Sequence, residues 1–171
     1  MELFILRHGE AGQRSASSAG DRKRPLTSTG KLEISEIAKA LKIIGLKFDL
    51  ILTSPLKRAY DTATIVSKVF HIVNKVQVWN ELAPEGQKTD LYRKISELKE
   101  EYIVLMVGHQ PLLGEMANDM IHRGKSSPCN LVLKKGGIMR IRLLTKGNVP
   151  RGELLWLMSP GLLRNIKKKK K

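Results

Sequence analysis

The first ten residues, MELFILRHGE (residues 1–10), decide how this chain folds. The uninterrupted apolar run at 3–6 predicts a short buried strand, because a strand covered on both faces reads as continuously hydrophobic. The run stops at Arg7, His8 and Gly9, which place a guanidinium, an imidazole and a turn residue directly after the strand. Ligands of open α/β sheets bind beyond the carboxyl ends of strands. We therefore expect a functional site at this end of the sheet.

Two further clusters follow strands in the same way, and none of the three clusters contains an acidic residue. A second strand is predicted at 49–53, and it runs into the segment SPLKR at 54–58. Another is predicted at 102–107, and it runs into Gly108-His109. Helix N-termini at such positions offer free N–H groups and a positive dipole end, which suit phosphate. The two arginines and two histidines expected to form one anion-binding site are Arg7, His8, Arg58 and His109.

Apolar runs alternate with amphipathic stretches along the whole chain, which indicates an α/β sheet with helices on its faces. Ser54 fits a helix N-cap and Pro55 fits the first helical position, so we expect a helix to begin there. The polar segment at 13–25 predicts a loop. Further strands are predicted at 76–79, 131–133, 138–144 and 153–158. Further helices are predicted from the apolar faces Ile34, Ile37, Leu41 and Ile44, then Leu91, Ile95 and Leu98, then Leu112 to Ile121.

Length and composition indicate one globular domain. The 171 residues fit a single domain spanning 1–171, with a basic C-terminal tail from about 161 to 171. Cys129 is the single cysteine, so no intrachain disulfide can form and a reducing compartment is expected. The N-terminus lacks a basic leader, and no stretch approaches the roughly 20 apolar residues of a membrane span. We expect a cytoplasmic protein with no membrane partner.

The chain carries a net charge of +15, and the lysine run at 167–171 contributes five of those charges. Such a balance can attract nucleic acid, anionic lipid or acidic proteins. Aromatic residues make up 5% of the chain and none interleaves with the basic runs, so a nucleic-acid stacking surface is not expected. A solvated basic surface is the simpler interpretation. Neither a C-x-x-C nor an H-E-x-x-H pattern occurs, so no zinc site is expected.

Four ordered segments resemble the signature segments of the histidine phosphatase superfamily. They are Arg7-His8-Gly9-Glu10, Arg24-Pro25-Leu26-Thr27 with Gly30, Ser54-Pro55-Leu56-Lys57-Arg58-Ala59 with Thr62 and Ala63, and Gly108-His109-Gln110-Pro111-Leu112. Within that superfamily the chain most resembles the SixA-type phosphohistidine phosphatases. The short length supports this, as do the segments NELAP at 80–84 and MSP at 158–160. The resemblance runs from residue 1 to about residue 160.

The resemblance implies a fold and a mechanism. The fold is a phosphoglycerate mutase-like, three-layer α/β/α arrangement with a mostly parallel central sheet. The enzyme is a phosphatase in which neutral His8 attacks phosphorus and becomes phosphorylated, before water releases phosphate. Arg7 and Arg58 hold the phosphoryl oxygens and lower the pKa of His8. His109 completes the cage and is expected to be protonated when phosphate is bound. The second ring nitrogen of His8 donates to a backbone carbonyl, and neither a metal nor a cofactor is implied.

The proton donor is left open by the sequence. Glu81 stands where superfamily members that cleave phosphomonoesters carry an acid, and a carboxylic acid there would protonate the leaving oxygen. Glu81 is equally consistent with a surface or helix-start glutamate. Phosphohistidine has an imidazole leaving group, which departs without a strong acid. The loop at 10–24 is expected to border the mouth of the pocket, with Arg14, Arg22, Lys23 and Arg24. These residues either attract an anionic substrate or are simply solvated, and the second interpretation is the simpler one.

The favoured substrate is a phosphohistidine on a protein, as the SixA type implies. The first alternative is a small-molecule phosphomonoester cleaved by the same residues. A phosphoglycerate mutase is less favoured, because the chain lacks room for that branch's longer specificity insertions. A rival from another class is a phosphate- or nucleic-acid-binding module without chemistry, which the +15 charge would support.

Overall fold

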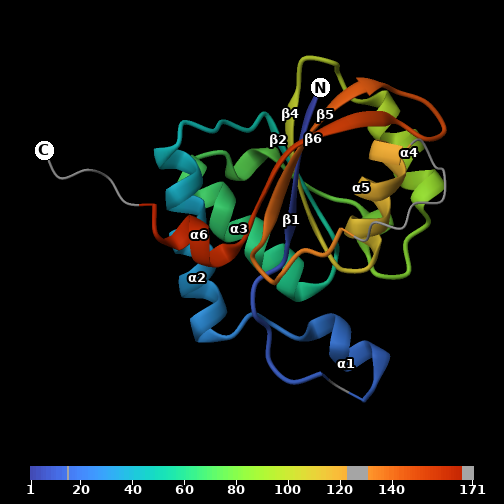
Figure 1. Cartoon of the computed structure of the whole chain (residues 1–171). Coiled ribbons are helices and arrows are strands. Elements are labelled where there is room, and N and C mark those ends of the chain that lie inside the picture. The colour runs from blue at the N-terminus through green and yellow to red at the C-terminus, as the bar shows by residue number, and fades with distance from the viewer. Residues whose placement is uncertain (15, 123–130, 167–171) are drawn as a thin grey trace, which may run out of the picture.

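The computed structural model of the chain describes residues 1–14, 16–122 and 131–166. Within these ranges six strands form one sheet in the order β3-β2-β4-β1-β5-β6 (Figure 1). The strands are β1 (Glu2–Arg7), β2 (Leu50–Thr53), β3 (Val76–Val78), β4 (Ile103–Gly108), β5 (Ile138–Thr145) and β6 (Arg151–Met158). The first four run parallel, while β5 pairs antiparallel with β1, and β6 pairs antiparallel with β5. The prediction of a mostly parallel sheet is confirmed.

Helices cover both faces of this sheet, so the predicted three layers are present (Figure 1). One face carries α2 (Ser28–Ile43), α3 (Lys57–Phe70) and α6 (Pro160–Arg164), and the other carries α4 (Lys88–Glu97) and α5 (Leu112–His122). Successive strand residues point to opposite faces. Leu3 and Ile5 therefore enter the core under α4 and α5, while Phe4 and Leu6 enter the core under α2 and α3. This double burial is why the four central residues of the first strand, at 3–6, are all apolar.

The strand register brings the three predicted clusters to one edge of the sheet. Arg7 is paired with Gly108, and Thr53 is paired with Val107. Just beyond the strands, the N–H of His8 donates to the carbonyl oxygen of Gly108 at 3.1 Å. The N–H of Ser54 donates to the carbonyl oxygen of Val107 at 3.0 Å. The segments after β1, β2 and β4 therefore leave the sheet side by side, as the sequence predicts.

The segment predicted as a loop at 13–25 contains a short helix, α1 (Ser18–Lys23). The side chain of Ser17 accepts a hydrogen bond from the N–H of Gly20 and caps the helix. None of its residues is buried, so the helix has no apolar face that a periodicity search would detect. An antiparallel β-bridge between Ala11 and Leu26 joins the two ends of the segment at 12–25, called the excursion below. Consequently α1 projects beyond the carboxyl ends of the parallel strands, at the bottom of Figure 1.

Three boundaries differ from those predicted. Helix α3 begins at Lys57, with Leu56 as its N-cap, so the prediction of Ser54 as N-cap and Pro55 as first helical residue is wrong. The segment at 131–133 is not a strand, although Leu133 is fully buried in the core. The basic tail was placed from about residue 161, whereas 160–164 form helix α6.

Helix α6 packs against α2 and is part of the core. Leu163 is fully buried there, and Arg164 forms ion pairs with Glu33 and Glu36 of α2 at 2.7 and 2.8 Å. Two short 3-10 turns, η1 (Val73–Lys75) and η2 (Asn80–Leu82), flank β3. The expectations for Cys129 and for the lysines at 167–171 concern positions outside the described residues.

Candidate active site

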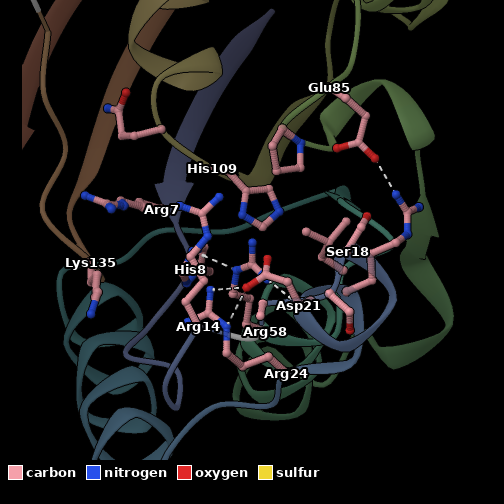
Figure 2. A pocket seen from close by; sticks show the side chains of 16 residues that line it. Arg7, His8, Arg14, Ser18, Asp21, Arg24, Arg58, Glu85, His109 and Lys135 are labelled. Atoms are coloured by element: carbon pink, nitrogen blue, oxygen red, sulfur yellow. Dashed lines mark hydrogen bonds and ion pairs between the residues drawn. The ribbon is translucent and has the colours of Figure 1, made fainter.

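Four of the five predicted site residues line one cavity of about 1060 Å³ at the carboxyl edge of the sheet (Figure 2). Arg7 and His8 come from the end of β1, Arg58 from the first turn of α3, and His109 from the residue after β4. His8, Arg58 and His109 are each less than a tenth exposed. The rings of His8 and His109 lie with their centroids 4.9 Å apart. The structure thus brings together the two arginines and two histidines, but not Glu81.

The environment of His8 fixes which ring nitrogen is free to react. Nδ1 lies 2.7 Å from the carbonyl oxygen of Gly9. A carbonyl only accepts, so this contact assigns the proton of the neutral ring to Nδ1, with the kind of acceptor that the resemblance implied. The lone pair is then on Nε2, to which Nε of Arg58 donates at 3.3 Å. Nε2 is therefore the ring nitrogen that carries the lone pair.

The same surroundings keep His8 uncharged. Burial lowers the pKa of His8 to about 4, against the opposing effect of the Gly9 hydrogen bond, and the charges of Arg58, Arg7 and Arg24 lower it further. The sequence pointed to the arginine charges as the cause, but burial is the larger one. At neutral pH the imidazole has no proton on Nε2 and can attack an electrophile.

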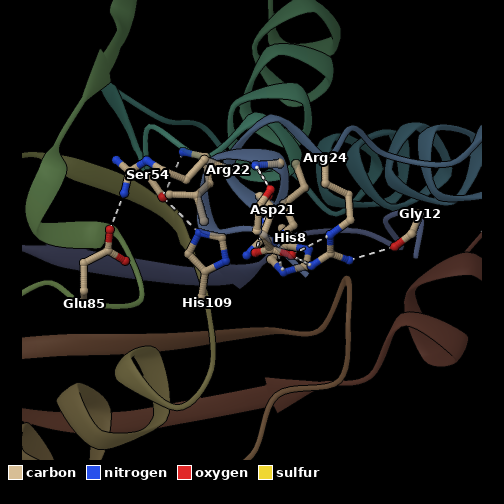
Figure 3. A network of polar contacts seen from close by, with 12 residues as sticks. His8, Gly12, Asp21, Arg22, Arg24, Ser54, Glu85 and His109 are labelled. Carbon is tan, nitrogen blue, oxygen red and sulfur yellow. Dashed lines mark hydrogen bonds and ion pairs between the residues drawn. The ribbon is translucent and has the colours of Figure 1, made fainter. Parts of the chain in front are cut away.

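His109 is oriented by Ser54 on the neighbouring strand end. Nε2 of His109 lies 2.9 Å from the hydroxyl of Ser54, and that hydroxyl also accepts the N–H of Leu56 at 3.2 Å. A hydroxyl that accepts from Leu56 can still donate its proton to Nε2, and in that arrangement the ring proton of His109 is on Nδ1. Figure 3 shows the second ring nitrogen of His109 on the side of His8. Nδ1 is buried and has no hydrogen-bond partner within the described residues.

The charge state of His109 follows from its surroundings. Burial lowers the pKa of His109 to about 2, and the charges of Arg58 and Arg7, together with the charge that His8 acquires at acidic pH, act in the same direction. His109 is therefore neutral in the free site, and the protonation of His109 expected when phosphate is bound stays a prediction. In the tautomer with its proton on Nδ1, that N–H is available to donate to an anion beside His8. The sequence left the role of Ser54 undetected, because its Ser-Pro context is typical of a helix start.

Each arginine is anchored by the backbone of a distant segment. Nη1 of Arg7 donates to the carbonyl of Leu133 at 2.7 Å, and its buried Nε has no partner in the part of the chain that the structure describes. Nη1 of Arg58 donates to the carbonyl of Asp21 at 2.9 Å. Burial lowers the pKa of Arg58 from its usual value, and the charge of Asp21 opposes that shift. Both guanidinium groups are thus fixed at the wall of the cavity.

A carboxylate that the sequence did not single out lies inside this cationic site. Asp21 of α1 places Oδ2 3.3 Å from Nη1 of Arg58 and accepts from Nε of Arg24 at 3.0 Å (Figure 3). Nη1 of Arg24 in turn donates to the carbonyl of Gly12 at 2.8 Å, which ties the excursion down. Asp21 therefore connects α1 to two arginines of the cavity wall, Arg58 and Arg24. The three-residue spacing of Asp21 and Arg24 predicts an ion pair between these two residues, but it does not predict the contact of Asp21 with the distant Arg58.

Two close backbone approaches hold the His8 loop against the helices. The N–H of Gly9 donates to the hydroxyl of Thr62 at 3.1 Å, and that hydroxyl donates to the carbonyl of Arg58 at 2.8 Å. A Cβ at Gly9 would lie 2.6 Å from Ile34, and a Cβ at Gly30 would lie 2.2 Å from the carbonyl oxygen of Glu10. Glycine at both positions lets the loop, α2 and α3 meet without steric conflict.

The structure does not bring Glu81 to the cavity. Glu81 lies in η2 and pairs with Nζ of Lys94 at 2.9 Å. Burial alone would raise the pKa of Glu81, but the hydrogen bond and charge of Lys94, with a backbone hydrogen bond and the charge of Arg93, lower it overall. An ionised carboxylate cannot donate a proton, so the arrangement favours the surface interpretation over the proton donor.

The cavity is strongly cationic. Its charged lining residues are Arg7, Arg14, Arg22, Arg24, Arg58 and Lys135 on the positive side and Asp21 and Glu85 on the negative side. Both acids are engaged in ion pairs, Asp21 with Arg58 and Arg24, and Glu85 with Arg22 across the mouth. A cationic cavity of this kind is suited to a tetrahedral anion beside an unprotonated imidazole, which is the arrangement needed for phosphoryl transfer.

The described residues hold neither a cluster of metal ligands nor a helix that could span a membrane. In residues 1–14, 16–122 and 131–166, no three His, Cys, Asp or Glu side chains are grouped as ligands for a metal ion. Over the same ranges, no helix combines the length and the apolar character needed to cross a membrane.

Comparison with known proteins agrees with this geometry. Residues 3–126 match the model of the histidine phosphatase superfamily (branch 1). The phosphohistidine phosphatase SixA of Escherichia coli K12 is 31% identical over 169 residues, covering 98% of this chain and 99% of the relative. An uncharacterised Picosynechococcus protein is 40% identical over 144 residues, covering 83% and 85% respectively. The structure of the protein histidine phosphatase SixA complexed with tungstate superposes with a TM-score of 0.81 at 30% identity, over 95% of this chain and 99% of the other.

Proposed function

Because the chain belongs to the histidine phosphatase superfamily, we propose that it is a protein phosphohistidine phosphatase that works through a covalent phosphohistidine on His8. The observation that carries this proposal is the geometry of His8. Its Nδ1 is held by Gly9 while its Nε2, with the pKa lowered to about 4, lies beside Arg58 in a cationic cavity. A cytoplasmic location is part of the proposal.

The first step transfers the phosphoryl group to the enzyme. Nε2 of His8 forms a bond to phosphorus as the bond from phosphorus to the substrate's ring nitrogen breaks, and the bonding pair returns to that nitrogen. The other nitrogen of the substrate ring carries a proton, so the product leaves as neutral imidazole. Arg7, Arg58 and the Nδ1–H of His109 bind the non-bridging oxygens, where negative charge concentrates in the transition state.

The second step returns the enzyme to its starting state. A water oxygen attacks phosphorus of phospho-His8, the P–N bond breaks, and its electron pair returns to Nε2. The proton lost by water passes to the phosphate product or to solvent. The hydrogen bond from Nδ1 to Gly9 keeps His8 in the tautomer whose Nε2 is free again. No metal is required, because the arginines neutralise the charge on phosphorus oxygens.

The carboxylates of the site favour phosphohistidine over a phosphomonoester. An alkoxide leaving group needs a proton in the transition state, whereas a ring that is already protonated on its second nitrogen does not. Glu81 pairs with Lys94, and the two acids in the cavity wall, Asp21 and Glu85, pair with arginines. No lining carboxyl group of the described residues is therefore placed as a free acid.

A substrate panel tests the proposal. Initial rates are compared for a histidine-phosphorylated protein, free phosphohistidine, an aryl phosphate, a sugar phosphate and a nucleotide. We expect kcat/KM at least about tenfold higher for the phosphohistidine compounds than for the esters. His8→Ala controls for background hydrolysis and should have no turnover. Higher rates on a small ester would establish the small-molecule alternative. No turnover combined with salt-dependent binding of DNA or RNA would favour the binding module.

A further inference from the structure

A second groove of about 560 Å³ lies beside the catalytic cavity, between α1 and the start of α3. It is lined by Ala19, Arg22, Lys23, Pro55, Lys57 and Tyr60. Arg22 also lines the catalytic cavity, and Pro55 directly precedes Leu56, which lines that cavity too. The two hollows therefore share a wall, and a molecule in one can extend into the other.

The groove combines positive charge with apolar surface. Three of its lining side chains are cationic and none is acidic. Lys57 pairs with Asp61 and Arg22 pairs with Glu85, but Lys23 is exposed and forms no ion pair with any residue that the structure describes. Tyr60 is 43% exposed, so a large aromatic surface faces solvent next to these charges. A ligand with carboxylates and some apolar surface complements such a groove.

We propose that this groove, defined by Lys23, Lys57 and Tyr60, docks an acidic segment of the substrate protein next to the phosphohistidine. The inference rests on the proposed function, since it assumes that the phosphoryl group in the catalytic cavity belongs to a polypeptide. The shared residue Arg22 supports a short reach, because an extended chain advances about 3.3–3.6 Å per residue. Acidic residues within a few positions of the phosphohistidine would therefore enter the groove.

The groove should affect recognition of a protein substrate but not of a small phosphoester. A small ester is contained in the catalytic cavity and does not contact Lys23 or Tyr60, which do not line it. A polypeptide gains contacts outside the cavity, and those contacts determine KM rather than the chemical step. The groove is thus a specificity-determining surface, distinct from the residues that bind the phosphoryl group.

Synthetic phosphohistidine peptides test the inference. Two peptides differ only in flanking residues, glutamate in one and lysine in the other, and an aryl phosphate serves as the small substrate. At low salt we expect the wild type to have a kcat/KM about three- to tenfold higher on the glutamate-flanked peptide, mainly through KM. Lys23→Glu should remove or reverse this preference, and Tyr60→Ala should raise KM for both peptides. Neither variant should change hydrolysis of the aryl phosphate.

Lys75→Glu is the matched control. Lys75 is exposed and precedes β3, at the edge of the sheet opposite the catalytic cavity, so the same charge reversal there should leave the peptide preference intact. The docking role of the groove is refuted if the wild type hydrolyses both peptides equally well, or if Lys23→Glu keeps the wild-type preference. Neither result would contradict the proposed function. If the wild type hydrolyses neither peptide but cleaves the aryl phosphate, the proposed function and the groove both fall.

Discussion

Replacing Ser54 by alanine tests how the site controls the proton on His109. The Ser54 hydroxyl lies 2.9 Å from Nε2 of His109 and accepts the N–H of Leu56 at 3.2 Å. Without the hydroxyl, Nε2 loses the donor that keeps it unprotonated. The ring can then hold its proton on Nε2, which leaves a lone pair on Nδ1 facing the phosphoryl oxygens. The substitution removes no atom that contacts substrate, so Ser54 is a positioning residue.

The size of the effect follows from burial. Ser54 is fully buried and His109 is 3% exposed, so water cannot replace the lost hydroxyl. Leaving a buried polar group without its partner costs about 1–3 kcal/mol. Only the part of this free energy that is lost in the transition state slows catalysis. Because about 1.4 kcal/mol corresponds to a tenfold change in rate, we expect kcat to fall roughly 10- to 100-fold. Binding of inorganic phosphate should weaken in the same direction, because the same Nδ1–H donates to it.

Two assays separate this role from loss of structure. Nitrogen-15 NMR of the imidazoles distinguishes the tautomers, and we expect His109 protonated on Nδ1 in the wild type and redistributed towards Nε2 in Ser54→Ala. A double-mutant cycle with His109→Asn should show that Ser54→Ala has little further effect once the ring is absent. A wild-type His109 protonated on Nε2, or fully additive effects of the two substitutions on kcat, would refute the reasoning.

Three further predictions follow from the fold and the site. The pKa of His8 is lowered to about 4, so Nε2 of the free enzyme should stay unprotonated down to that pH. Nitrogen-15 NMR should show the His8 imidazole titrating near pH 4, and a midpoint near 6.5 would contradict the buried, uncharged His8. Glu81→Gln should change the rates on phosphohistidine and on an aryl phosphate by less than about twofold, because Glu81 pairs with Lys94 away from the cavity. A large loss of rate on the aryl phosphate alone would show that Glu81 is the proton donor. Leu163→Ala should lower the free energy of unfolding by about 2–4 kcal/mol in urea titrations, because Leu163 is fully buried. Leu162 is 64% exposed, so Leu162→Ala should lower it by less than about 0.5 kcal/mol. Equal effects of the two substitutions would show that α6 does not pack against the core.

The arrangement of the main site residues could be predicted because each follows a strand in the chain. Apolar runs ending in Arg7-His8 and in Gly108-His109 identify parallel strands, and the carboxyl ends of parallel strands share an edge. Local pattern was therefore enough to bring these segments together. The same argument placed Arg58, although its helix starts later than predicted.

The remaining features depend on contacts between distant segments. Helix α1 has no buried residue, and its position depends on Asp21 contacting Arg58. The Ser54-Pro55 pair is typical of a helix start, but the hydroxyl of Ser54 is used by His109 instead. Leu131–Leu133 has strand-like composition, yet the carbonyl of Leu133 accepts from Arg7 rather than from a neighbouring strand. Local propensity cannot report such tertiary contacts.

The covalent step at His8 can be measured directly. The enzyme is mixed with a histidine-phosphorylated protein, the reaction is stopped within milliseconds in alkali, where phosphohistidine survives, and the chain is digested for mass spectrometry. The account predicts one added phosphoryl group on Nε2 of His8, formed and lost at rates compatible with turnover, and absent in His8→Ala. Undiminished turnover by His8→Ala, or a phosphoryl group that accumulates on another residue in the wild type, would contradict it.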